Sequence, residues 1–275
     1  MNVKLVILFV FMSVLTVKAQ DSKLFFGLNV GAKFGNKNYA LRYTGAYQNE
    51  LPLQFDNPNI YQQVFQSLGD KNFTFSQFNE RYRYTPAMNL GLLIGYNTSP
   101  NLQASIAINF SRLKMLSTYT LEVIDPSNFT TQGQYVTGNI LGEESRFNGK
   151  FNLDYIFDGD KVRFIIGASG LFLAWRIEKQ FAELNNESII LPLFSLHNPN
   201  NNITTKTSGM GWGYGVNTGI EFNLNDKFKG QLMYQPYLSR VEYFVTKNQK
   251  ELLGTSYQKP QHRLEHDLTL RLIWK

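Results

Sequence analysis

Eight segments of this 275-residue chain alternate apolar and polar residues with a period of two, and this repetition constrains the fold more than any other feature. Such alternation is typical of β-strands whose two faces meet different surroundings. The segments span residues 24–34, 88–96, 102–110, 147–157, 162–172, 210–222, 228–238 and 264–274. Eight such strands separated by turn residues predict an all-β fold, an antiparallel up-and-down β-barrel.

The connections between these segments alternate in length. Three tight turns follow Tyr96, Phe157 and Asn223. The four long connections span residues 36–81, 121–144, 177–207 and 245–261. Short turns at one rim and long loops at the other are typical of transmembrane barrels of the outer membrane, with periplasmic turns and extracellular loops. The even strand count places both termini at the short-turn rim.

The N-terminus carries the pattern of a secretory signal peptide. Lys4 precedes an apolar stretch at 5–17, and Val17-Lys18-Ala19 resembles a cleavage site. We therefore expect a signal peptide at 1–19 and one barrel domain at 20–275. A retained helix would be short for a bilayer, which needs roughly 20 apolar residues. The absence of cysteine excludes a lipid anchor after the cleavage site, disulfides and thiolate sites.

Alternation alone does not say which face points outward, since a soluble lipocalin-like barrel has the opposite arrangement. The polar face is rich in glycine, which suits a crowded interior and makes a poor exposed strand surface. Charged residues form only 17% of the chain, against about 25% in typical soluble domains. Aromatic residues gather at both ends of the apolar face: Tyr96, Phe157, Phe222, Phe228 and Trp274 beside the short turns, and Phe34, Phe110, Phe147 and Trp212 near the long loops. These two girdles predict a lipid-facing exterior.

Three local patterns resemble a known family. They are Gly-Tyr-Asn-Thr-Ser-Pro-Asn at 95–101, Gly-Trp-Gly-Tyr-Gly at 211–215, and the final apolar strand that ends in Trp274 and Lys275. With the alternation, they make the mature chain similar to the PorT-like outer-membrane β-barrel family of Bacteroidetes, although the usual final aromatic residue is here followed by Lys275. The resemblance implies a barrel in the cell outer membrane of a Gram-negative bacterium after Sec-type export. It carries no catalytic motif, and some members of the family are linked to secretion.

The histidines and serines give no convincing reactive site. His262 and His266 share one strand face, but four residues along a strand separate them too far to share a metal. A lipid-modifying enzyme would need a nucleophile and a base, for which Ser239 or Ser256 with one of these histidines could be proposed. Almost any sequence offers such pairs. We therefore predict no catalytic, cofactor-binding or metal-binding residues, no cofactor, and no enzyme activity.

Ten charged residues fall on the polar face: Lys33, Lys150, Asp154, Arg163, Glu221, Lys229, Arg263, Glu265, Asp267 and Arg271. They could form an ion pathway or an interior network that satisfies itself. We expect the network, because eight strands enclose a space that side chains fill and because buried charges must be paired.

The first long connection contains helix-compatible spacing at Ile60, Val64, Phe65 and Leu68. It is also rich in aromatic residues, as binding loops often are. A cap over the barrel mouth and a binding surface are equally compatible with this composition.

The leading functional hypothesis is a non-enzymatic outer-membrane barrel whose long loops bind a partner or assemble with envelope proteins. A narrow or gated channel and a lipid-modifying enzyme are the alternatives. Outer-membrane lipid and an envelope protein are the expected partners. Nucleic acid is not expected, because the net charge of +6 is scattered and no basic run carries interleaved aromatic residues.

Overall fold

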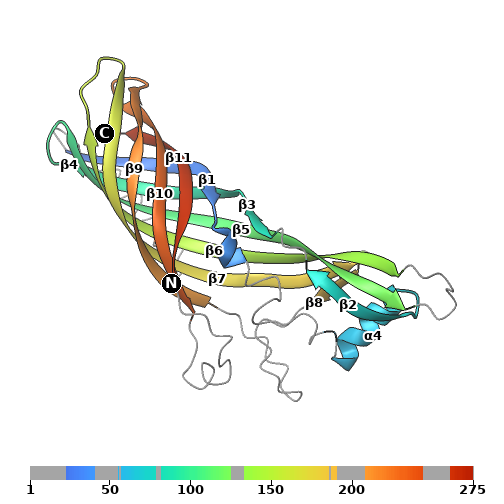
Figure 1. The fold of residues 1–275 in the computed structure, drawn as a ribbon. Helices are drawn as coiled ribbons and strands as arrows, with labels where there is room; N and C mark the ends of the chain where they lie inside the picture. The colour runs from blue at the N-terminus through green and yellow to red at the C-terminus, as the bar shows by residue number, and fades with distance from the viewer. Residues whose placement is uncertain are drawn as a thin grey trace, which may run out of the picture.

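Eight antiparallel strands form a closed ring in a computed structural model of the chain, which confirms the predicted barrel (Figure 1). The ring order is β1–β4–β5–β6–β7–β9–β10–β11, and pairing of β1 with β11 closes it. The structure describes residues 23–40, 55, 57–78, 82–124, 133–185, 187–190, 208–243 and 261–274. The predicted signal peptide at 1–19 lies outside these residues.

The strands of the ring are β1 (Leu24–Phe34), β4 (Ala87–Asn97), β5 (Leu102–Ile124), β6 (Gln134–Ile156), β7 (Val162–Leu184), β9 (Ser208–Asn223), β10 (Phe228–Tyr243) and β11 (His262–Trp274). Five further elements lie outside the ring: α2 (Lys37–Ala40), α4 (Pro58–Ser67), β2 (Asn72–Phe78), β3 (Arg83–Thr85) and β8 (Glu187–Ile190). Within the described ranges, no helix is long and apolar enough to cross a membrane.

The three predicted tight turns join β4 to β5, β6 to β7, and β9 to β10. The first and last strands also meet at this rim, because Leu24 lies opposite Tyr96 and Trp274 lies opposite both Phe26 and Phe228. The predicted placement of the described chain ends at the short-turn rim is therefore confirmed.

Two of the expected long loops are wrong in their boundaries, because β5, β6 and β7 each run for 23 residues. They continue through 121–124, 134–144 and 177–184, which the sequence had indicated as loop. A transmembrane strand needs only 9–11 residues, and the excess corresponds to roughly 40 Å of strand. We call this projecting sheet the wing, formed by residues 112–124, 134–145 and 175–184 with β2, β3, β8 and α4.

The wing has its own hydrophobic core on one face of the sheet. The predicted helical spacing is confirmed by α4, whose Ile60 and Val64 are buried in this core. The side chain of Asn57 caps the helix by accepting a hydrogen bond from the backbone N–H of Asn59, at 3.0 Å. Figure 1 shows α4 at the far end of the wing. The first long connection was compatible with a cap over the barrel mouth. For α4 this interpretation is wrong, because the helix packs on the wing.

Inward glycines give neighbouring side chains the room that the sequence indicated. A Cβ atom at Gly95 would lie 2.0 Å from the ring of Phe25. Phe25 is buried inside the barrel, so the missing side chain at Gly95 lets this ring fill the space.

Candidate functional site

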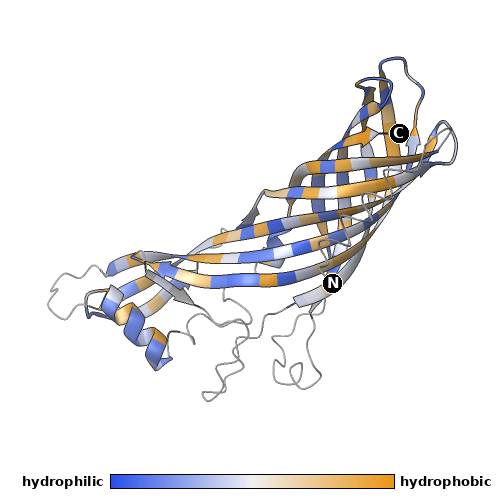
Figure 2. Cartoon of the chain, turned by 180° about the vertical axis from the view of Figure 1, so that it is seen from behind, coloured by the Kyte–Doolittle hydropathy of each residue, from blue (hydrophilic) through white to orange (hydrophobic). Residues whose placement is uncertain are grey.

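The polarity of the two faces of β5 is exchanged part-way along the strand. Up to Phe110, the outward side chains are exposed apolar residues and the inward ones are buried polar residues such as Asn109. From Arg112 onward, the outward side chains include the exposed Arg112 and Lys114, while the inward Leu113 is fully buried. Figure 2 shows hydrophilic and hydrophobic residues alternating along both the barrel and the wing.

The outward faces of the neighbouring strands change from apolar to polar at the same register. Phe110 pairs with Phe147 of β6, which pairs with Ala174 of β7. One step further, Arg112 pairs with Ser145, which pairs with Arg176. We call the line between these two rows the inversion row. An apolar exterior on one side and a polar exterior on the other is the arrangement expected where a barrel passes from an apolar medium into water.

The apolar exterior lies on the short-turn side of the inversion row, which we call the side below it. This exterior has aromatic residues at both edges, as predicted. Phe34, Phe110 and Trp212 are exposed toward the long-connection rim. At the short-turn rim, the ring of Trp274 stacks on Phe26 with centroids 6.4 Å apart. The predicted outward phase of all eight barrel strands is thereby confirmed.

In the barrel interior near the inversion row, one arginine side chain lies between two carboxylates. Arg146 of β6 forms ion pairs with Glu144 of the same strand and with Glu265 of β11. All three side chains are almost fully buried. The guanidinium also lies 5.6 Å from the ring centre of Tyr39 and 5.5 Å from that of Tyr84.

These two tyrosines cover the mouth of the barrel on the wing side. The hydroxyl of Tyr84 donates to Glu144, at 2.8 Å, and that of Tyr39 donates to the backbone carbonyl of Ser239, at 2.6 Å. Tyr39 belongs to α2 in the first connection. The cap interpretation therefore describes this part of the connection, whereas α4 packs on the wing.

A second layer of the interior is centred on Asp267. Its carboxylate lies 2.6 Å from the ammonium of Lys150 and 3.8 Å from that of Lys33. The hydroxyl of Tyr237 donates to the same carboxylate, at 3.3 Å, and accepts from Lys33, at 2.5 Å. These side chains come from β1, β6, β10 and β11, so the network joins strands from around the ring.

A third layer pairs Arg271 with Asp154, at 3.4 Å, and Asp154 also accepts from Asn217, at 2.6 Å. The expectation that inward charges pair is therefore confirmed for most of the predicted set. Glu144 and Arg146 were missed, because the sequence assigned the chain up to residue 144 to a loop. The signal that could have found them was the continued alternation of β6.

The exposed face of the wing carries mixed charges and a few large apolar residues. Glu143 contacts Arg112, at 2.5 Å, and Lys114, at 3.5 Å. Leu116 and Tyr135 are exposed on the same face. On the opposite, covered face, burial raises the pKa of Tyr119, so this phenol stays neutral.

Of the residues considered for catalysis, those within the described ranges do not form a nucleophile–base pair. Ser239 is buried inside the barrel and donates to Glu265, at 3.2 Å. His262 and His266 face outward on β11, where His262 contacts the ring of Trp212 and His266 lies 2.8 Å from the hydroxyl of Tyr234. Ser256 lies outside the described residues. In the described part of the chain, no group of three or more histidines and acids is placed to hold a metal ion.

No family model matches the chain, and no curated protein matches it in sequence. Among solved structures, the chain is similar to Neisserial surface protein A, with a TM-score of 0.41 and 10% sequence identity. The match covers 92% of this chain and 97% of the other. At this low TM-score and identity, the likeness carries no information about function.

Proposed function

We propose that the chain is a non-enzymatic barrel of the outer membrane that holds the wing on the extracellular side as a platform for binding an envelope or surface partner. The inversion row carries this proposal. Below it, lipid would cover the apolar exterior. Above it, water would solvate Arg112, Lys114 and Arg176, while the core of the wing stays covered.

The continuity of the strands makes the wing suitable for this role. β5 and β6 pair without interruption from Leu102 to Val123, so the platform is an extension of the barrel wall and keeps a fixed orientation. Tyr135 is exposed on it, and tyrosine is among the residues enriched in protein contact surfaces.

A narrow channel receives less support from the interior. Lys33, Arg146, Glu265 and Asp267 are each at most 1% exposed, which means that water does not reach them. The PorT-like resemblance remains part of the proposal, and it favours a partner that belongs to a secretion or envelope assembly.

The proposed orientation can be tested with single cysteines, because the chain has none of its own. Tyr135→Cys on the wing should react with a membrane-impermeant maleimide in intact cells. Asp226→Cys, in the β9–β10 turn at the opposite rim, should react only after the cells are opened. The reverse labelling pattern would contradict the orientation.

The binding role can be tested with the same Tyr135→Cys variant and a bifunctional cross-linker of short reach. We expect a discrete cross-linked adduct of higher mass in intact cells, with Asp226→Cys in opened cells as the matched control. Labelling of Tyr135→Cys without any discrete adduct would leave the orientation standing and refute the binding platform.

A further inference from the structure

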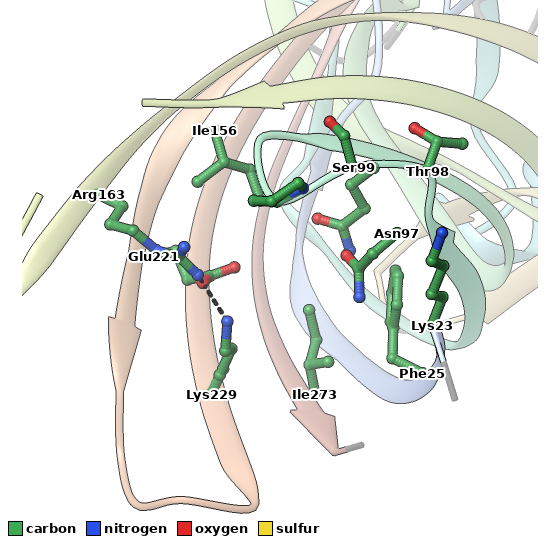
Figure 3. A pocket seen from close by; sticks show the side chains of 12 residues that line it. Lys23, Phe25, Asn97, Thr98, Ser99, Ile156, Arg163, Glu221, Lys229 and Ile273 are labelled. Atoms are coloured by element: carbon green, nitrogen blue, oxygen red, sulfur yellow. Dashed lines mark hydrogen bonds and ion pairs between the residues drawn. The ribbon is translucent and has the colours of Figure 1, made fainter. Parts of the chain in front are cut away.

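A pocket of about 640 Å³ opens at the short-turn rim of the barrel (Figure 3). Twelve residues line it, from the start of β1, the β4–β5 turn and the rim ends of the other strands. Phe25, Ile156 and Ile273 give it an apolar part, and all three are buried. The pocket lies at the end of the barrel opposite the wing, so the proposed function does not use it.

More cationic than acidic side chains line this pocket. Lys23, Arg163 and Lys229 line it, and Glu221 is the one acidic residue among the twelve. Glu221 accepts from Lys229, at 2.9 Å, and from Arg163. Figure 3 shows these three side chains together on one side of the pocket, with Lys23 on the other. One carboxylate thus faces two cations, and a third cation stands across the opening.

The deeper interior has no such excess. Its almost fully buried cations are Lys33, Arg146, Lys150 and Arg271, and its almost fully buried acids, Glu221 aside, are Glu144, Asp154, Glu265 and Asp267. Four cations therefore meet four acids in the layers above the pocket. The positive excess of the pocket lies where the barrel opens to solvent at the short-turn rim, and an incoming anion could balance it there.

We propose that this pocket binds a carboxylate joined to an apolar group, as at the C-terminus of a peptide that ends in an apolar residue. The carboxylate would lie between Arg163, Lys229 and Lys23, because a guanidinium binds carboxylate through two parallel hydrogen bonds. The apolar group would lie against Phe25, Ile156 and Ile273. A free apolar acid has the same chemistry and is the other possible source.

The volume and the position of the pocket agree with such a ligand. Pockets for small ligands typically enclose about 300–1,000 Å³ and combine an apolar lining with a few placed polar groups. The pocket is separate from the wing. This proposal therefore rests on the proposed function only in assigning the short-turn rim to the periplasmic side of the membrane.

The experiment measures binding to the purified full-length protein in detergent. The probe is the fluorescent-labelled peptide Ala-Ala-Phe-Leu with a free carboxylate, compared with the same peptide as its C-terminal amide. We expect the amide to bind at least about tenfold more weakly, since it cannot form the charged contacts. Isovalerate should compete with the peptide if a free acid is the natural source, and should fail to compete if peptide contacts are required.

Substitutions in the pocket distinguish it from other surfaces. Arg163→Gln should weaken binding of the peptide acid about tenfold, whereas Lys161→Gln, in the neighbouring β6–β7 turn and outside the pocket lining, should leave it unchanged. Glu221→Gln should strengthen binding, because it removes the competing carboxylate. If Glu221→Gln fails to fold, Lys229→Gln takes its place, with weaker binding expected.

Three results would overturn the proposal. They are equal binding of the acid and the amide, no effect of Arg163→Gln, and displacement of the bound peptide acid by inorganic phosphate. The last result would reveal a general oxyanion site in which the apolar residues play no part. Because binding is measured in detergent solution, failure here leaves the orientation and the wing untouched.

Discussion

Replacing Arg146 with methionine is expected to lower the free energy of unfolding by about 3–5 kcal/mol, because it leaves two buried carboxylates without a partner. Arg146 is 1% exposed and forms ion pairs with Glu144 and Glu265. Its guanidinium also packs beside Tyr39 and Tyr84. The measurement is a urea titration of the refolded protein in detergent, followed by the mobility shift between folded and unfolded barrel on a gel.

Arg112→Met is the matched control for this prediction. Arg112 lies on the same sheet and also contacts a glutamate, Glu143 at 2.5 Å, but its side chain is half exposed. Exposed ion pairs contribute about 0–1 kcal/mol. Equal destabilisation by the two variants would show that Arg146 does not hold the interior together.

Replacing Leu270 with arginine is expected to reduce insertion into the membrane strongly. Leu270 is 50% exposed near the middle of β11, between the outward apolar side chains of Val30 and Leu232. An arginine facing lipid at mid-depth costs about 2–4 kcal/mol. The folded fraction in isolated outer membranes, read from the same gel shift, measures the effect.

Thr269→Ser tests the opposite face of the same strand. Thr269 points inward and is 3% exposed, so the loss of one methyl group should leave insertion almost unchanged. If Leu270→Arg inserted as well as Thr269→Ser, the outward face of β11 would not meet lipid.

The barrel itself could be predicted from the sequence because its strands repeat one pattern. Most keep apolar residues in one phase and polar residues or glycine in the other, β7 with its inward Ile165 and Leu171 being less regular, and tight turns mark three of the hairpins. In the last strand, for example, Leu264, Leu268 and Leu270 share the outward phase, and the structure places all three there.

The wing escaped prediction because the alternation continues there with its polarity exchanged. Leu113 and Met115 point inward, whereas Ile106 and Ile108 of the same strand point outward. Taken alone, such a reversal looks like the end of a strand. A β-bulge in β7, where Ile177 and Lys179 pair with the consecutive residues Glu144 and Glu143 of β6, further obscures the pattern. Only the pairing of three long strands shows that they continue as one sheet.

The Arg146 network escaped prediction for a related reason. Glu144 fell inside an expected loop, and the partner of Arg146 on the far side, Glu265, lies 119 positions away in the sequence. A single sequence contains no information on which inward charges meet across a barrel. The pairing of inward charges was predictable from the cost of burying them alone, but the identities of the partners were not.

Extraction of native membranes with alkaline carbonate is the most direct test of the central claim, that the apolar exterior below the inversion row faces lipid. The protein should stay in the membrane pellet after carbonate treatment and become soluble only in detergent. Release of folded protein into the carbonate supernatant would contradict the claim and would favour the soluble, lipocalin-like alternative.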